Sequence, residues 1–394
     1  MPSTEGQDSS SPAPFLSPSP FRSFGRSIFS PRREHSQSME AIHEYNFSDT
    51  ELESFQKQIV DRLHDLSGAS ADELISVDWI RKLLDSFIYF QEEFKVILLK
   101  NKTQISRPPL DHLVGEYFER SLKALDVCNA TRSGIDKVHL WQKHLEIVLC
   151  ALDSRQRVIG KGQFRRARKA LMDLELAMSE EKDSDSVISY RNPPPSFGRN
   201  NQSSKNYRHP HHRSLSLTVS PSASAARQIQ LMANNLIQPR LNEIMSTNGL
   251  ALTIYTISSV LMFVLWTLVT AIPNQDKGLN IHLSFPRHLS CGFPLLLLHE
   301  RIVEETRRRN RPNSNTGSLK EIYKIQKCAR QLTELIDLPD DQFPITEEHK
   351  NQVEEGVKEL ALVSDAFKSG LDSLEQQVRE VFHRIACFRN DFRI

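Results

Sequence analysis

Histidine is the residue type whose clustering in this chain first suggests chemistry. His209, His211 and His212 lie close together in the sequence RHPHHR, and imidazole is a common metal ligand. No carboxylate or thiol lies near them, and the surrounding stretch is rich in Pro, Asn, Ser and Arg. His139 and His144 are five residues apart on a predicted helix, a spacing that suits a shared metal poorly. We therefore predict no metal site, and we attribute His209, His211 and His212 to the composition of the linker.

The motifs of nucleotide-binding and hydrolytic enzymes are missing from the sequence. It contains no GxxxxGK[ST], GxGxxG, HExxH or GxSxG pattern. The segment VIGKGQF has two glycines and a lysine but lacks the phosphate-loop spacing. Paired acids such as Glu92-Glu93 and Glu347-Glu348 fit helix surfaces or first turns, where negative charge suits the helix dipole. We expect a protein without catalytic residues and without a cofactor.

The cysteines are scattered and odd in number, and no two form a CxxC pair. This pattern is typical of a reducing compartment and argues against a disulfide scaffold or a structural zinc site. The N-terminal residues show no apolar signal-peptide core. Their arginines and serines resemble a transit peptide, but their prolines disfavour an amphipathic helix. We therefore expect a cytoplasmic protein, with a membrane-associated or integral membrane pool as the open alternative. The cysteines are Cys128, Cys150, Cys291, Cys328 and Cys387.

Charge distribution carries the clearest indication of a partner. The formal net charge is only +1, so overall charge predicts no nucleic-acid binding. Residues 155–169 hold seven basic residues and no acid, however, and an acidic run follows at 171–185. This basic patch could bind anionic lipid head groups or an acidic protein face, or it could be a solvated helix face paired with the acidic run. Its members are Arg155, Arg157, Lys161, Arg165, Arg166, Arg168 and Lys169.

Apolar residues recur at three- and four-residue steps over most of the chain, and no stretch alternates with a period of two. We predict an all-α, elongated bundle of roughly eight to ten helices. Residues 1–45 are predicted to be a disordered tail and 182–222 a disordered basic linker. The helical regions 46–181 and 223–394 are expected to pack as one domain. Residues 110–152 are predicted to form either one long helix or two helices that meet near Ser133-Gly134, and Gly370 is predicted to mark a kink or a boundary between two helices.

Four Ser-Pro steps in the predicted tail are candidate phosphorylation sites. Phosphate beside the neighbouring arginines would cancel local positive charge. Composition alone explains the steps equally well. The serines are Ser11, Ser17, Ser19 and Ser30.

The segment LALTIYTISSVLMFVLWTLVTAIP, residues 250–273, is apolar and uncharged. Its length is about that of a helix crossing a hydrocarbon layer of roughly 30 Å. Five of its six hydroxyl residues share one side of a helix, as in a helix packed against others. Flanking charge is balanced, so a membrane orientation is poorly specified. A buried core helix and a membrane span both remain open. The residues expected in its apolar surface are Leu252, Ile257, Val260, Phe263, Val264, Trp266 and Leu268.

Several sequence blocks together resemble the plant ROH/BYPASS-related family of helical proteins. The blocks are FRSFGRSIFSPRR, LESFQKQIVDRL, WQKHLEIVLCALD, GQFRRARKALMDLELAM and MFVLWTLVTAIPNQDKGL. The resemblance implies a non-enzymatic plant protein and, for the ROH branch, binding to the membrane-targeting subunit of the exocyst. The BYPASS branch implies instead a membrane-anchored protein that controls a root-derived developmental signal. The family has no established catalytic residues to carry over, and oligomeric state is not indicated.

Overall fold

The computed structural model describes residues 50–153, 160–179, 224–273, 281, 283–287, 289–309, 316–338 and 344–392. These residues form helices and no strands, which confirms the predicted all-α class. Eleven helices are present within the described ranges, and two of them, α4 and α8, are short. The helices are α2 (Thr50–Ser67), α3 (Val77–Lys100), α4 (Lys102–Ile105), α5 (Leu110–Ala151), α6 (Lys161–Ser179), α7 (Ala225–Asn234), α8 (Leu241–Ser246), α9 (Leu250–Ala271), α10 (Gly292–Arg309), α11 (Lys320–Ile336) and α12 (Glu347–Asp391).

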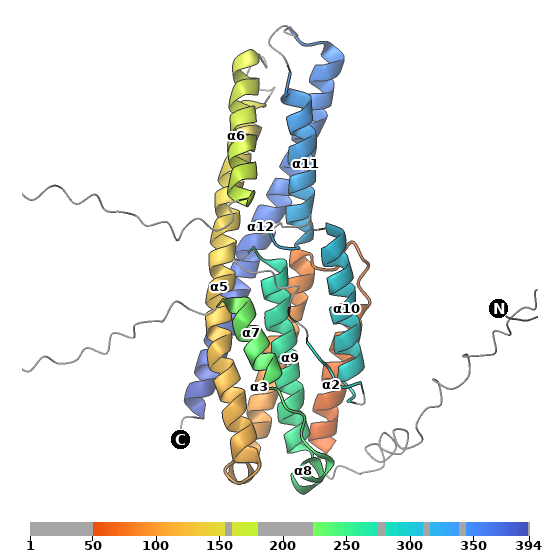
Figure 1. The fold of residues 1–394 in the computed structure, drawn as a ribbon, viewed down its shortest axis with the longest axis vertical. Helices are drawn as coiled ribbons and strands as arrows, with labels where there is room; N and C mark the ends of the chain where they lie inside the picture. The colour runs from red at the N-terminus through yellow and green to blue at the C-terminus, as the bar shows by residue number, and fades with distance from the viewer. Residues whose placement is uncertain are drawn as a thin grey trace, which may run out of the picture. The chain divides into compact units, whose positions relative to one another are not determined.

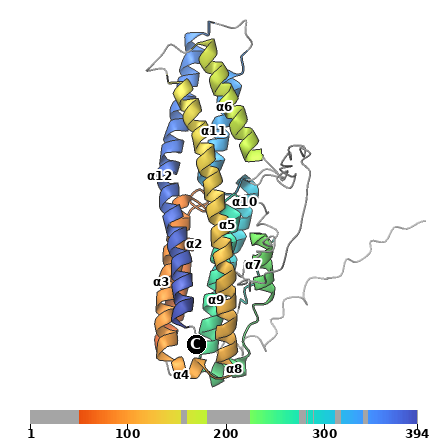
Figure 2. The ribbon, with the colours of Figure 1, turned by 90° about the vertical axis from the view of Figure 1, so that its left-hand side faces the viewer.

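The two longest helices, α5 and α12, run side by side through the unit formed by residues 47–394 (Figures 1 and 2). At 1.5 Å per residue, the 42 residues of α5 extend about 63 Å. At one end, α6 and α11 pack against α5 and α12. We call α6, α11 and the parts of α5 and α12 that they contact the arm. At the other end, the same two long helices pack with α2, α3, α7, α9 and α10. We call this part the body. Helices from both sides of residues 182–222 therefore share one compact unit.

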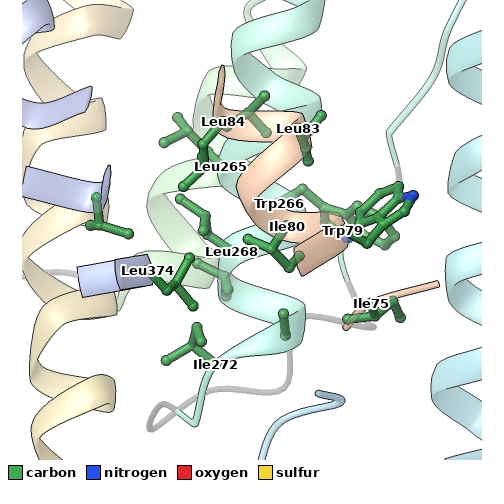
Figure 3. Close-up of a cluster of buried hydrophobic side chains, with 14 of the residues drawn as sticks. Ile75, Trp79, Ile80, Leu83, Leu84, Leu265, Trp266, Leu268, Ile272 and Leu374 are labelled. Atoms are coloured by element: carbon green, nitrogen blue, oxygen red, sulfur yellow. The ribbon is translucent and has the colours of Figure 1, made fainter. Parts of the chain in front are cut away.

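Helix α9 lies in the centre of the body. It contacts α2, α3, α5, α7, α8 and α10, and every one of its 22 residues is buried. In Figure 3, Leu265, Trp266 and Leu268 of α9 lie among Ile80 and Leu84 of α3 and Leu374 of α12. An amphipathic helix buries one stripe, whereas a helix that is apolar on all sides needs neighbours on all sides. The body supplies those neighbours.

Two glycines considered as helix boundaries, Gly134 and Gly370, lie where another segment packs closely against the helix. Helix α5 continues through Gly134, and a Cβ there would lie 2.2 Å from the carbonyl oxygen of Pro273. Helix α12 continues through Gly370, where a Cβ would lie 3.1 Å from a methyl group of Val77. Of the two alternatives for residues 110–152, the single long helix is therefore the one observed, and α12 has no boundary at Gly370. At Gly134 a side chain would collide with the backbone after α9, so glycine is needed there, whereas at Gly370 the contact with the Val77 side chain is tight.

Two helix boundaries have local causes. α7 and α8 are separate helices because Pro239, in the segment between them, has no N–H to donate. The capping pattern at Ser70 and Glu73 closes a turn, in which the Ser70 N–H donates to Glu73 at 3.1 Å. Helix α3 begins later, with Ser76 as its N-cap accepting from the Trp79 N–H.

Candidate functional site

The residues predicted for the apolar helix all lie inside the body. Leu252, Ile257, Val260, Phe263, Val264, Trp266 and Leu268 are buried. α9 is also the one helix among the described residues long and apolar enough to cross a membrane. Within the window that meets this criterion, 94% of the residues are buried by the protein itself. A membrane span would present such a surface to lipid or to other spans, whereas this surface faces the charged amphipathic helices of the same chain.

The hydroxyl groups of α9 are satisfied mainly within the helix. Thr253, Ser258 and Ser259 donate to the carbonyl oxygens four residues earlier at 2.8–3.1 Å. Thr256 donates instead to Oε1 of Gln56 on α2, at 3.1 Å. Local bonds of this kind allow hydroxyl residues inside an apolar core without a penalty for unpaired groups. The hydroxyl residues of α9 therefore do not mark a separate polar face.

A buried polar cluster, not predicted from the sequence, lies between α5 and α9. Its central residue is Arg120, whose guanidinium donates to Ser258 Oγ and to Glu116, each at 3.5 Å. Burial lowers the pKa of Arg120, and the nearby Glu116 carboxylate partly offsets that shift. Burial also raises the pKa of Tyr117 to about 12. The sequence does contain an indication of this buried arginine, because Arg120 is spaced as part of the buried stripe of α5, between Tyr117 and Ala124.

Two arginines of α10 form hydrogen bonds with the loop between α2 and α3, and one of them also bonds to the residue that precedes α11 by two positions. Arg309 is buried, pairs with Glu305 at 2.7 Å and donates to the carbonyl oxygens of Ser318 and Ala71 at 3.1 and 3.2 Å. Arg301 donates to the carbonyl oxygen of Ala69 at 2.6 Å. Both arginines thus hold the loop that connects α2 to α3. We call this region the junction.

Glu321 completes the junction from the first turn of α11. Its two carboxylate oxygens accept from the Val77 N–H, each at 3.2 Å, at the N-terminus of α3. Burial raises the pKa of Glu321, and the bonds to backbone N–H groups oppose this shift. The positive end of the α3 dipole stabilises the carboxylate, so the residue links the two helices electrostatically.

An open hollow of about 720 Å³ lies beside the junction. Its lining mixes acidic and basic side chains, and several are engaged with one another or with backbone groups. In the lining, Lys320 pairs with Asp72 at 2.7 Å, and Glu321 caps α3. Sites for small molecules are typically enclosed and mostly apolar, unlike this charged surface. Among the described residues no group of three or more His, Cys, Asp or Glu side chains could hold a metal ion.

The predicted basic patch lies on α6 as far as the structure describes it. Arg165, Arg166, Arg168 and Lys169 are exposed, and Lys161 is half-buried at the start of the helix. Arg168 pairs with Asp337 at the end of α11, at 2.7 Å. The patch is therefore partly an internal link of the arm. Arg155 and Arg157 lie outside the described residues, as do the candidate phosphorylation sites Ser11, Ser17, Ser19 and Ser30.

Two exposed apolar side chains continue the basic patch along α6. Met172 is 59% exposed and Leu176 is 62% exposed, although the helix already buries Phe164, Leu171 and Leu174 on its other side. The sequence analysis did not single out these residues. Both residues lie on the side of α6 opposite its buried stripe. Their exposure can be predicted from the sequence only after that stripe has been assigned correctly.

The fold and its surfaces define a helical bundle protein whose buried polar groups serve packing and whose exposed arm carries a basic and apolar face. The family model described as "Protein ROH1-like" matches residues 17–392, and the chain belongs to this plant family. The predicted resemblance to the ROH family is thereby confirmed.

Two relatives from Arabidopsis thaliana are similar over nearly the whole chain. Protein ROH1D is 46% identical over 381 residues, which cover 94% of this chain and 95% of that protein. Protein ROH1A is 36% identical over 373 residues, which cover 86% and 88%. UPF0496 protein 4 of Oryza sativa subsp. japonica is 21% identical over 282 residues, which cover 71% of this chain and 53% of that protein. No solved structure matches the chain.

Proposed function

We propose that this chain is a non-enzymatic interaction protein that regulates exocytosis in plants by binding the membrane-targeting subunit of the exocyst. Family membership supports the class of protein, and the resemblance to the ROH branch supports the partner. The observation that carries an interaction role is the exposed combination of Arg166, Lys169, Met172 and Leu176 on α6. Basic and apolar groups side by side suit recognition of another protein.

A binding assay with purified components tests the proposal. The full chain, shown by circular dichroism to be helical, is immobilised and exposed to each exocyst subunit in turn. We expect saturable binding to the membrane-targeting subunit and weaker or no binding to the others. Absence of binding to every exocyst subunit, with folded protein on the surface, contradicts the proposal.

The alternative is a membrane-anchored, BYPASS-like protein that controls a root-derived developmental signal. The burial of all of α9 by the body favours a core helix over an anchor. We therefore propose a cytoplasmic protein with a membrane-associated pool held through its partner. Alkaline carbonate extraction of plant membranes is expected to release that pool. Retention in the pellet would favour the anchored alternative.

A further inference from the structure

The outward side of α6 places basic and apolar side chains in one line. Arg165, Arg166, Lys169, Met172 and Leu176 are all exposed. At 100° per residue they fall within about 120° of the helix circumference. We call these five residues the α6 face. Its basic half lies toward the start of the helix and its apolar half toward the end.

The apolar half of the α6 face lies outside the buried stripe through which α6 packs in the arm. The buried stripe of α6 packs against α5 and α11 through residues on the opposite side, and Trp141 of α5 donates to the carbonyl oxygen of Ala177 at 3.3 Å. Met172 and Leu176 are spaced four residues apart, so they lie one turn apart on the surface. Exposed apolar pairs at this spacing are the contacts that a docked helix uses.

Two of the three basic residues in this face, Arg166 and Lys169, are exposed and form no ion pair with a described residue. By contrast, Arg168 is paired with Asp337. Two positive charges therefore lie one or two turns from the exposed apolar pair. A binding partner with carboxylates at the matching positions gains favourable electrostatic interactions.

We propose that the α6 face is the docking surface for an amphipathic helix of a partner protein. Acidic side chains of that helix lie opposite Arg166 and Lys169, and its apolar side chains cover Met172 and Leu176. The identity of the partner as an exocyst subunit rests on the proposed function, but the chemistry of the surface does not. A protein helix fits better than an anionic membrane, because Asp173 and Glu175 flank the apolar half and repel anionic head groups.

A synthetic peptide supplies a direct probe of the surface. The peptide is helical, with glutamates in one half of a single face and leucines in the other half at i, i+4 spacing. A peptide of the same composition in scrambled order is the control. We expect the patterned peptide to bind the full chain, with an affinity that falls as salt is added. The scrambled peptide is expected to bind at least about tenfold more weakly.

Paired variants test each half of the face. Arg166→Glu with Lys169→Glu, and separately Met172→Ser with Leu176→Ser, are each expected to weaken peptide binding by about tenfold or more. Lys57→Glu with Lys102→Glu gives the same charge change at exposed body positions, and Leu362→Ser removes a side chain that is 74% exposed on α12. These controls should change the affinity by less than about twofold.

The outcomes separate the docking surface from the proposed function. Failure of the patterned peptide to bind, equal binding by the variants, or binding of phosphatidylserine vesicles in its place overturns the docking surface. If the exocyst subunit binds the native chain and the α6 variants equally, the docking surface is wrong and the proposed function stands. If the peptide discriminates between variants but no exocyst subunit binds, the proposed function is wrong and the docking surface stands.

Discussion

At the scale of single residues, the buried charge of Arg120 is the least expected feature of the core. The side chain is 6% exposed, and its two contacts, to Glu116 and Ser258, are each 3.5 Å long. Removing a guanidinium from water is costly, and contacts of this length return little of that free energy. Arg120 therefore contributes less to stability than an apolar side chain of similar length would.

Replacing Arg120 by Met tests this conclusion. We expect the free energy of unfolding of Arg120→Met to be unchanged or higher, because the methionine avoids the desolvation of the charge. Urea denaturation of both proteins gives the comparison. Trp266→Ala in the same core is the reference and should lose about 3–5 kcal/mol. A loss of more than about 2 kcal/mol in Arg120→Met would show that the buried charge is well compensated.

The cysteines divide into reactive and protected residues. Cys150 and Cys387 are exposed, whereas Cys128, Cys291 and Cys328 are buried. A maleimide should therefore label two cysteines of the native chain quickly and all five after denaturation. Peptide mass spectrometry identifies the labelled positions. Fast labelling of Cys128 in the native chain would contradict the arrangement of α5.

The same burial predicts an alkaline loss of stability. Burial raises the pKa of Cys128 to about 12 and that of Cys291 to about 11. Unfolded thiols ionise at lower pH, so the unfolded state loses protons first as pH rises. The contribution of these thiols is complete below about pH 9 and is lost as the pH rises through the folded-state values. The thermal midpoint should therefore fall as the pH is raised above about 9. It should fall less steeply in a variant with Cys128→Ala and Cys291→Ala. Each midpoint is compared with that of the same protein at pH 8.

At the scale of helices, the close packing of distant segments explains why α5 and α12 contain glycines without being interrupted by them. Glycine lowers helix propensity, so Gly134 and Gly370 indicate breaks when the sequence is read locally. The reason for each glycine lies in a segment distant in sequence, namely Pro273 after α9 and Val77 at the start of α3. A local pattern contains no information about these neighbours.

Two glycines of α5 provide a matched test. A Cβ at Gly134 would lie 2.2 Å from the Pro273 carbonyl oxygen, whereas a Cβ at Gly115 has no neighbour within 4 Å. Gly134→Ala should lower the free energy of unfolding by about 1–3 kcal/mol or more, through forced displacement of the α9 end. Gly115→Ala should raise it by about 0.5–1 kcal/mol, because alanine favours the helix. Destabilisation by both substitutions to the same extent would argue against the close contact.

At the scale of the whole unit, α5 and α12 connect the arm and the body. Neither helix is interrupted where the two parts meet, and Arg309 and Glu321 fasten the same region from α10 and α11. Loss of either part would leave the continuing halves of both long helices without partners. The arm and the body should therefore unfold together rather than as separate domains.

Single-tryptophan variants can monitor the two parts. Trp141 reports on the arm through its bond to Ala177, and Trp266 reports on the core of the body. Variants that keep only one of these residues should show coincident urea transitions, each matching the transition seen by circular dichroism. An earlier transition at Trp141 would mean that the arm melts independently of the body.

The amino-acid sequence by itself was enough to predict the helical class and the family, because the first depends on local periodicity and the second on contiguous motifs. It also limited the role of residues 250–273 to a core helix or a membrane span. Only the tertiary structure decided which groups lie around that segment, since a helix apolar on all sides requires neighbours that no local pattern identifies. Only the tertiary structure also decided the surroundings of Arg120, of the junction and of the α6 face. The role of each depends on which side of its helix is covered by other helices.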